Sequence, residues 1–528
     1  MIKSYLHKTV IIIGLLMVSI SQTGMVFIAP KAAMISNSSN TLKLSDNLGV
    51  NQGLSNNVSF IEKANLKHVY VNFSDGFSEA ELMSYANPEN FSYEFKTADI
   101  WLSTKDIARL TLNPKVLSII EVSPAQFMSG GFLTEGYSDA SHGIQSYLQN
   151  GNSAGEGIKI GVISNGVNNI QTAIASGDIP ADVVIMKDRY IGDEGTAMLE
   201  ILHDIAPAAK LYFSDSGNST IGLNNSIKRL VDAGCNIIVD DAVYISEPFF
   251  EDGIVAKYIE SYATPKGVLY ISSAGNFADS HYQGTFTSTY NKPNYEQDFS
   301  QGVGSIQHLP FTVLANSKVM VVLQWNDPYK DSKNDLFLKV CDSSLMTTCF
   351  TSDNAQLGVG YSPYELVTLS NTTNASLTYY VGVYSFTPKT NVQIELYTFN
   401  GRVLNYGVEA DSIFGHATSK DVLAIAATNQ NAISVKRPYS SIGPFTMLDG
   451  TTRNKPDFTG VDNVTVSGTG GFTSPLNGTS AAAPHIAGIA ALLWSNAMTL
   501  SRTDLIALIK SNTLDLMQEG FDVNTGYG

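Results

Sequence analysis

Apolar and polar positions follow a pattern typical of an α/β domain in two separate stretches of the chain. In the first stretch, short apolar runs are bounded by glycine and polar residues and are separated by helical segments. Runs of this kind indicate strands that are buried on both faces of a sheet. The expected strands are 158–163, 210–213, 237–239 and 268–271, and the expected helices are 194–202 and 254–262.

The same pattern returns after residue 406, with an expected strand at 422–427 and expected helices at 480–494 and 501–510. Strands that alternate with helices predict a doubly wound parallel sheet. The predicted fold class is therefore α/β, with residues 128–280 and 406–528 as two parts of one domain.

A smaller repeat of strands and helices precedes this domain. Strands are expected at 68–73, 91–95, 100–102 and 116–122, and helices at 78–85 and 104–110. Ser78 and Glu81 have the spacing of a capping box at the start of the first helix. The resulting βαββαβ order predicts a ferredoxin-like unit over residues 66–127.

Residues 281–405 contain no helical pattern. Apolar and aromatic runs at 318–323, 336–340 and 377–384 are separated by polar turns, which predicts an inserted β-sandwich. Asp327, Asp331, Asn334 and Asp335 crowd one loop of this region. A polar turn explains this loop. A structural calcium site is the alternative, although the spacing is not that of an EF-hand.

The N-terminus has the pattern of an export signal. Lys3, His7 and Lys8 precede an apolar run at 10–20, which is too short to span a bilayer. We expect a signal peptide over residues 1–33 and an Asn- and Ser-rich linker over 34–65. The prediction is a secreted protein, or a periplasmic one, without a stable membrane span; an uncleaved anchor is the alternative.

Composition narrows the classes of function. Of the 528 residues, 48 are acidic and 32 are basic, which gives a net charge of −16. A protein that binds nucleic acid by neutralising phosphates needs the opposite balance, so that class is excluded. Three cysteines exclude a disulfide scaffold. Cys341 and Cys349 are expected to form a local disulfide, with two separate thiols as the alternative, and Cys235 is expected to be a buried thiol.

Polar residues follow four of the expected strands, at 164–166, 214–215, 240–241 and 272–276. In a parallel sheet these strand ends meet at one edge, where functional residues collect. Loop polarity alone would give a similar pattern.

The sequence Asn-Gly-Thr-Ser-Ala-Ala-Ala-Pro-His-Ile-Ala-Gly at 477–488 places Ser480 at the start of a helix, where free N–H groups bind an oxyanion. Pro484 is expected in the first turn of that helix.

The motif at 477–488 resembles the nucleophile motif of subtilisin-like serine peptidases. Residues 157–167 resemble the strand that ends in the catalytic Asp of that family, and 273–276 resemble the segment that carries its oxyanion Asn. Residues 440–444 and 455–457 resemble the segment before the nucleophile. The resemblance implies a serine peptidase with Ser480 as nucleophile and with Asn276 and the Ser480 N–H as oxyanion hole. It also implies that residues 66–127 are a propeptide that inhibits the enzyme within the same chain.

Two positions depart from the family pattern. Glu194, in the run Asp-Glu-Gly-Thr at 193–196, stands where the family has its catalytic His, and Asn165 stands where it has Asp. His203 cannot replace the missing His, because nine residues turn a helix by about 900° and place it on the opposite face. A divergent subgroup with Asp-Glu-Gly at this helix also has the stretches seen here at 240–244 and 247–250, so Glu194 resembles a feature of that subgroup.

Glu194 is the candidate general base, because a carboxylate with a pKa of about 4.3 accepts protons in acid. The related sedolisins use Ser, Glu and Asp, with the Asp four residues after the Glu, but here that position is Met198. Asn165 can orient a neighbour, and Asp241 or Asp240 is favoured over Asp193 as the second acid. His416 is interpreted as a structural residue.

The sequence therefore predicts a secreted, acid-favouring serine endopeptidase that acts on protein or peptide substrates through an acyl-enzyme. It calls for no organic cofactor. The alternative hypothesis is an inactive pseudopeptidase that binds a partner through the inserted β-sandwich, since both the His and the Asp positions are replaced.

Overall fold

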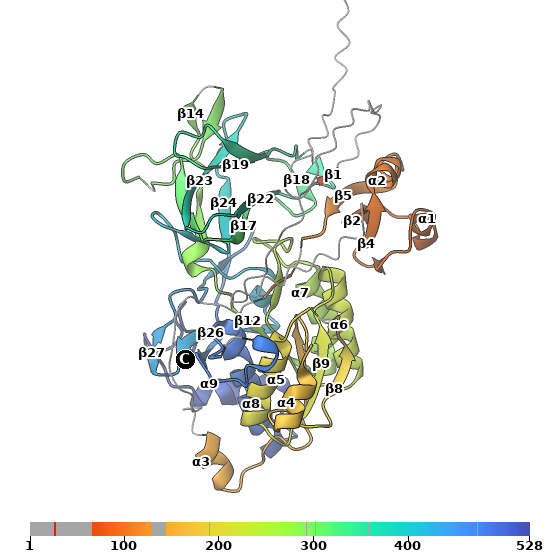
Figure 1. Cartoon of the computed structure of the whole chain (residues 1–528), viewed down its shortest axis with the longest axis vertical. Helices are drawn as coiled ribbons and strands as arrows, with labels where there is room; N and C mark the ends of the chain where they lie inside the picture. Colours follow the sequence, from red (N-terminus) through yellow and green to blue (C-terminus); the bar gives the residue numbers. More distant parts are fainter. Residues whose placement is uncertain are drawn as a thin grey trace, which may run out of the picture.

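The computed structural model describes residues 26–27, 66–123, 125–127, 144–189, 191–291, 293–300, 302–356, 358–472 and 474–528. The predicted linker at 34–65 lies outside the described residues. So does the predicted signal peptide, except for Val26–Phe27, which forms strand β1 against β5. Figure 1 shows three groups of elements: an α/β unit, an antiparallel β unit above it, and a small N-terminal unit to one side. Within the described part of the chain, no helix has the length and apolarity needed to cross a membrane.

The α/β unit is built on an eight-stranded sheet with the order β27-β26-β12-β10-β7-β9-β8, to which β30 is added beside β26. All of its neighbouring strands are parallel except β26 and β27, so the sheet is mixed at one edge. The strands are β7 (Lys159–Ser164), β8 (Val184–Lys187), β9 (Lys210–Asp215), β10 (Ile237–Asp240), β12 (Leu269–Ser273), β26 (Val422–Asn429), β27 (Ala432–Lys436) and β30 (Phe458–Asp462).

Helices cover both faces of this sheet, as the alternating pattern predicts. One face shares a core with α4 (Ile170–Ser176), α5 (Glu194–Ile205), α8 (Thr479–Asn496) and α9 (Arg502–Asn512). The other face packs on α6 (Thr220–Asp232), α7 (Ile254–Tyr258) and the π-helical turn at Ile259–Ala263. The short helix α3 (Ile144–Gln149) precedes the unit in sequence.

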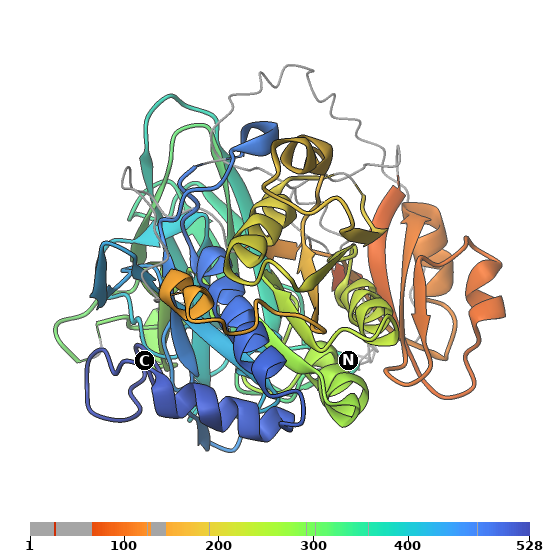
Figure 2. The same cartoon turned by 90° about the horizontal axis from the view of Figure 1, so that it is seen from below.

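The N-terminal unit contains β2 (Leu66–Phe73), α1 (Glu79–Met83), β3 (Asn90–Ser92), β4 (Thr97–Ser103), α2 (Thr104–Leu110) and β5 (Val116–Glu121). Its antiparallel strands have the order β5-β2-β4-β3. Ser78 and Glu81 form the expected capping box of α1. Figure 2 shows this unit, in orange and red, beside α6 of the α/β unit.

The region between β12 and β26 forms two antiparallel sheets that share one apolar core. One sheet has the order β13-β24-β17-β22, and the other contains β14, β15, β23, β16 and β25, with β19 and β20 added at β23. The disulfide between Cys341 and Cys349 joins β19 and β20, and Cys235 is a buried free thiol, as expected. The strands are β13 (His281–Thr285), β14 (Thr289–Asn291), β15 (Asn294–Glu296), β16 (Leu309–Val313), β17 (Ser317–Trp325), β19 (Phe337–Cys341), β20 (Cys349–Ser352), β22 (Tyr364–Asn371), β23 (Leu377–Ser385), β24 (Gln393–Phe399) and β25 (Gly401–Val403).

Three short strand pairs complete the architecture. They are β6 (Ala125–Phe127) with β11 (Ala242–Tyr244), β18 (Asp331–Ser332) with β21 (Gly358–Val359), and β28 (Phe445–Thr446) with β29 (Thr452–Arg453). The pair of β6 and β11 joins the end of the N-terminal unit to the segment directly after β10.

The position of Pro484 differs from the sequence prediction. Helix α8 begins at Thr479, so Pro484 lies in its second turn and not in its first. Proline lacks an N–H, and the bond lost at this position is the one to the carbonyl of Ser480, four residues earlier. The helix accommodates this loss because it is buried and packed along most of its length.

Candidate active site

The predicted site residues approach one another at the carboxyl ends of the parallel strands. β7 ends at Ser164, β10 ends at Asp240 and β12 ends at Ser273. β7 and β12 are the two neighbours of β10 in the sheet, so Asn165, Asp241 and the 274–276 turn follow adjacent strands. The sheet topology therefore brings these segments to one edge, as the strand-end pattern predicts.

Ser480 is the second residue of α8, directly after the Gly478–Thr479 step. Gly478 has φ +111, a backbone conformation that residues with side chains rarely adopt. The Ser480 hydroxyl is fully buried, and among the described residues its Oγ atom has no hydrogen-bond partner. The N-terminal end of α8 supplies backbone N–H groups and the positive end of the helix dipole at this position.

Asn276 lies in the turn after β12 and is held by Thr479. The Thr479 N–H and the Thr479 hydroxyl each donate to Asn276 Oδ1 at 3.1 Å, and Gly275 N–H donates to Thr479 Oγ1 at 3.3 Å. These bonds fix the amide oxygen toward Thr479 and orient the Asn276 NH₂ group in the opposite direction. An amide donor fixed next to a helix N-terminus has the composition of an oxyanion hole.

Glu194 is the first residue of α5 and is fully buried. Its backbone N–H donates to Asn165 Oδ1 at 3.1 Å, and Asn165 Nδ2 donates to Glu194 Oε2 at 3.4 Å. Asn165 thus binds both the backbone and the side chain of Glu194. This geometry fits the orienting role predicted for Asn165.

Helix α5, which begins with Glu194, packs closely on α8, which carries Ser480. A Cβ atom on Gly488 of α8 would lie 2.7 Å from Ile205 Cγ2 and 2.9 Å from its Cβ, so only glycine fits there. The two helices share the core on one face of the sheet. Both helices begin at the edge where the strand ends meet, with Glu194 and Ser480 in their first turns.

Asp241 is fully buried beside Glu194 and Ser164. Burial raises the pKa of Asp241 well above its usual value, and the neighbouring charge of Glu194 raises it further, while Ser164 lowers it. Two carboxyl groups in contact cannot both ionise easily. The pair therefore keeps one proton at pH values at which an isolated carboxyl group would be ionised.

The other two acids have different surroundings. Asp193 caps a turn: its Oδ1 accepts from Asn169 N–H at 2.7 Å, and its Oδ2 accepts from Asn169 Nδ2 at 2.7 Å. Asp240 points away from Asp241, because successive side chains of a strand alternate between faces. Its carboxylate binds Tyr270, Ser272 and His416. Of the acids named from the sequence, only Asp241 lies beside Glu194.

Sequence reasoning did not identify Thr479 and Ser164 as functional residues. Thr479 is adjacent to the nucleophile in the Gly-Thr-Ser motif, and that adjacency was the available signal. Ser164 is a strand-end residue with no distinguishing pattern, and its relation to Asp241 depends on the pairing of β7 with β10.

The loop predicted as a polar turn or a calcium site is a hydrogen-bonded turn around Asp327. Asp327 Oδ2 accepts from Lys333 N–H at 2.8 Å and from Ser332 Oγ at 3.0 Å, and Asp327 Oδ1 accepts from Asn334 Nδ2 at 2.9 Å. Within the described residues, no group of three or more His, Cys, Asp or Glu side chains is placed to hold a metal ion.

One family model and several solved structures are similar to parts of this chain. A family model described as the subtilase family matches residues 398–528. No curated protein matches the chain. Similar solved structures include the CspB protease of Clostridium perfringens, which is 15% identical, with 73% of this chain and 95% of that chain covered and a TM-score of 0.46.

A second similar structure is a mutant of the epidermin leader peptide processing serine protease of Staphylococcus aureus, which is 11% identical, covers 88% of this chain and 97% of that chain, and has a TM-score of 0.44. A lanthipeptide protease is 16% identical, covers 74% of this chain and 90% of that chain, and has a TM-score of 0.37. The family match covers the C-terminal part of the α/β unit with the Gly-Thr-Ser motif. Residues 398–528 thus match the subtilase family, which confirms the predicted resemblance to subtilisin-like serine peptidases over this part of the chain.

Proposed function

We propose that the protein is a serine endopeptidase that hydrolyses peptide bonds through an acyl-enzyme on Ser480, with Glu194 as the general base. The observation that carries this proposal is the burial of Glu194 between Asn165 and Asp241, at the start of the helix that packs closely on α8. A base must be fixed within reach of its nucleophile, and this arrangement fixes Glu194 from two sides.

The proposed chemical steps use side chains of this site and the backbone N–H of Ser480. Ionised Glu194 takes the proton of the Ser480 hydroxyl as its oxygen attacks the substrate carbonyl. Asn276 Nδ2–H and the Ser480 N–H donate to the oxygen that becomes negative, and Glu194 returns the proton to the leaving amine. Water then attacks the ester carbonyl with the same carboxylate as base, and Ser480 is released.

The pair of Glu194 and Asp241 gives this reaction a dependence on pH. With one shared proton, Glu194 is ionised while Asp241 is neutral. Activity falls at low pH, where both groups are protonated. It falls again when the pH rises above the raised pKa of Asp241, because the buried pair would then carry two negative charges. We therefore expect a bell-shaped profile that favours mild acid.

The N-terminal unit supports a role as inhibitor within the same chain. It docks on the start of α6, where Thr220 N–H donates to Tyr70 OH at 2.9 Å and Ser219 Oγ donates to Asp99. Beyond that unit, β6 pairs antiparallel with β11, which begins one residue after Asp241. A segment in this position occupies strand-pairing groups that an extended peptide substrate would use. Residues 66–127 are therefore proposed as a propeptide of a secreted enzyme that carries a signal peptide at 1–33.

The proposal is tested with purified protein and its Ser480→Ala variant. Wild type is expected to hydrolyse a denatured protein substrate and to cleave itself between residues 127 and 150, and Ser480→Ala is expected to do neither. Absence of turnover between about pH 3 and pH 8, with identical processing of both proteins, would overturn it.

One observation favours a second candidate, a pseudopeptidase that binds a partner through residues 281–405. Ser480 Oγ is buried, and among the described residues it has no hydrogen bond to a base. This candidate predicts that wild type and Ser480→Ala bind a protein or glycan partner equally and that neither shows turnover.

A further inference from the structure

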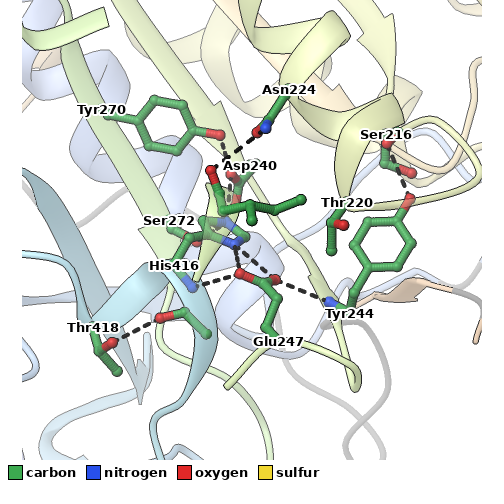
Figure 3. A network of polar contacts seen from close by, with 12 residues as sticks. Ser216, Thr220, Asn224, Asp240, Tyr244, Glu247, Tyr270, Ser272, His416 and Thr418 are labelled. Carbon is green, nitrogen blue, oxygen red and sulfur yellow. Dashed lines mark hydrogen bonds and ion pairs between the residues drawn. The ribbon is translucent and has the colours of Figure 1, made fainter. Parts of the chain in front are cut away.

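A buried cluster of charged side chains, which contains Asp240, Glu247 and His416, lies at the end of β10 (Figure 3). Its centre is His416, for which the sequence predicts a structural role. His416 lies in the 3-10 turn Gly415–Thr418, in the segment that leads from the antiparallel sheets back into the α/β unit. The side chain is fully buried.

Both ring nitrogens of His416 face carboxylates. Nε2 lies 3.0 Å from Asp240 Oδ2, and Nδ1 lies 3.1 Å from Glu247 Oε1 and 3.2 Å from Glu247 Oε2. A neutral imidazole has only one N–H, so only the imidazolium can donate to both acids. With both acids ionised, these contacts therefore favour the charged form of His416.

The remaining contacts of the two acids are donors. Asp240 accepts from the Tyr270 hydroxyl and from Ser272 Oγ at 2.6 Å. Glu247 accepts from His416 N–H at 2.9 Å and from Tyr244 N–H at 3.2 Å. Tyr270, from β12, is a further titratable group in this cluster. Burial alone would lower the pKa of His416, but the charges of Glu247 and Asp240 raise it well above its usual value.

Asp240 is adjacent in sequence to Asp241, whose pKa it also raises by its charge. The other groups that face Asp241 are Glu194 and Ser164. The imidazolium of His416 thus contacts Asp240 and Glu247, and Asp240 in turn neighbours the pair of Asp241 and Glu194. Without this cation, the charge of Asp240 would act on the pair of Asp241 and Glu194 with no compensation.

We propose that His416 is a positioning residue of the active site, which holds the end of β10 through Asp240 and offsets its charge beside the pair formed by Glu194 and Asp241. This inference rests on the proposed function, since the pair matters as the base of Ser480. His416 touches neither substrate nor Ser480 in this role; it acts through Asp240.

Two substitutions with opposite effects test the proposal. His416→Gln removes the cation and leaves the charge of Asp240, so the pair is easier to protonate. Asp240→Asn removes the charge and keeps an acceptor for Tyr270 and Ser272, so the pair is harder to protonate. The readout is the pH at which labelling of Ser480 by an active-serine phosphonate is half-maximal on its acid side.

The acid-side midpoint is expected to rise by about one pH unit in His416→Gln and to fall in Asp240→Asn. His203→Gln is the matched control, because His203 lies on the same helix as Glu194 but outside the cluster, and it should leave the midpoint unchanged. A lost contact alone would lower the extent of labelling without moving the two midpoints in opposite directions. Midpoints that are unchanged, or that move together, would overturn the proposal.

A second readout needs no activity. Because the pKa of His416 is raised in the folded protein, its stabilisation is complete below the unfolded value near 6.5 and is lost as pH rises through the folded value. In the Ser480→Ala background, the loss in urea midpoint caused by His416→Gln should therefore be larger at pH 6 than at pH 9. Equal losses in urea midpoint at both pH values would overturn the charged state of His416, even if no peptidase activity is found. If Ser480 is not labelled but the loss in urea midpoint depends on pH, only the proposed function is overturned.

Discussion

The contacts of Asn165 distinguish two descriptions of the site. It is either a His triad that has lost its His and Asp, or a site built to use a carboxylate as the base. In a decayed triad, Asn165 is only the remnant of a lost Asp. Here its amide group donates to Glu194 Oε2 and its oxygen accepts from the Glu194 N–H. A carboxylate at this position could accept from the N–H but could not donate to Glu194. The residue suits a neighbouring carboxylate better than the family Asp would.

We therefore predict that Asn165→Asp lowers activity. The change places a third acid beside Glu194 and Asp241, which raises the pKa of the base and removes its ionised form near pH 5. A shift of one pKa unit corresponds to about a tenfold loss of labelling rate at that pH. Asn165→Ala, which removes the amide without adding charge, separates the two effects. An increase in rate for Asn165→Asp would show that the site is a damaged His triad.

The resemblance to the subtilase family led to Ser480 as proposed nucleophile, Glu194 as proposed base and Asn276 as proposed oxyanion residue, because the family's motifs have a fixed order along the chain. They did not settle which acid supports Glu194. Asp240 and Asp241 are equivalent in sequence, and only the alternation of side chains at the end of β10 sends one toward Glu194 and the other toward His416. His416 was interpreted as structural because a single His in an apolar segment carries no pattern.

At the scale of elements, the predicted strands and helices of the α/β unit are present with small shifts at their ends. The pairing of β6 with β11 was not predicted, since three residues carry too little pattern and the two partners are far apart in sequence. The second-turn position of Pro484 was missed for a related reason. The start of α8 is set by the turn at Gly478 and by burial, which a local helix rule does not include.

The contact between α5 and α8 is the element-scale feature that joins the helix of Glu194, the proposed base, to the helix of Ser480, the proposed nucleophile. Gly488→Ala is expected to force these helices apart, because the added Cβ would lie within 3 Å of the branched carbon of Ile205, which has little freedom to move. We expect a loss of stability of about 1–3 kcal/mol by urea unfolding and a larger loss of Ser480 labelling than stability alone explains. Labelling equal to wild type would contradict this account of how Glu194 is placed.

At the scale of the whole molecule, we expect the buried acid Glu365 to make the antiparallel sheets more stable in mild acid. Glu365 accepts hydrogen bonds from Ser352, from Gln356 Nε2 at 3.0 Å and from Asn354 Nδ2 at 3.0 Å. Burial raises its pKa from 4.5 to about 8. Between these values the folded protein holds a proton that the unfolded chain releases, so stability falls as pH rises.

Glu365→Gln is predicted to flatten that dependence, because glutamine keeps acceptors without titrating. The slope of unfolding free energy against pH should fall by up to about 1.4 kcal/mol per unit between pH 5 and pH 7. Glu519→Gln makes the same change of charge on an exposed side chain and should leave the slope as it is. A slope that is the same in both variants would contradict the assignment.

The N-terminal unit also contacts the antiparallel sheets. Ser123 and Tyr364 approach through their hydroxyls at 3.5 Å, and Gly360, with φ +94, lies where a Cβ would be 3.0 Å from the Leu117 carbonyl oxygen of β5. A cavity of about 20 Å³, enough for one water molecule, is lined by residues of all three units, including Ser118, Ser246 and Ser362. The sheets therefore help to hold the N-terminal unit in place.

Gly360→Ala is predicted to loosen this contact. In the Ser480→Ala background, amide hydrogen exchange of β5 should become faster while exchange of β17 and β24 stays the same. Gly302→Ala is a matched control, because Gly302 has a similar φ of +87 but nothing within 4 Å of its added Cβ. Equal exchange of β5 in the two variants would show that the sheets do not hold the unit.

The central claim is that Glu194 is the base of Ser480. The most direct test is labelling of Ser480 by an active-serine phosphonate from about pH 3 to pH 8, in the full chain and in its Glu194→Gln variant, with Ser480→Ala as the blank. Glutamine retains the size and the hydrogen-bonding atoms of Glu194 but cannot accept the proton. We predict labelling of wild type in mild acid and a loss of about 10²–10⁴-fold in Glu194→Gln. Equal labelling of the two proteins, or no labelling of wild type at any pH, would contradict the claim.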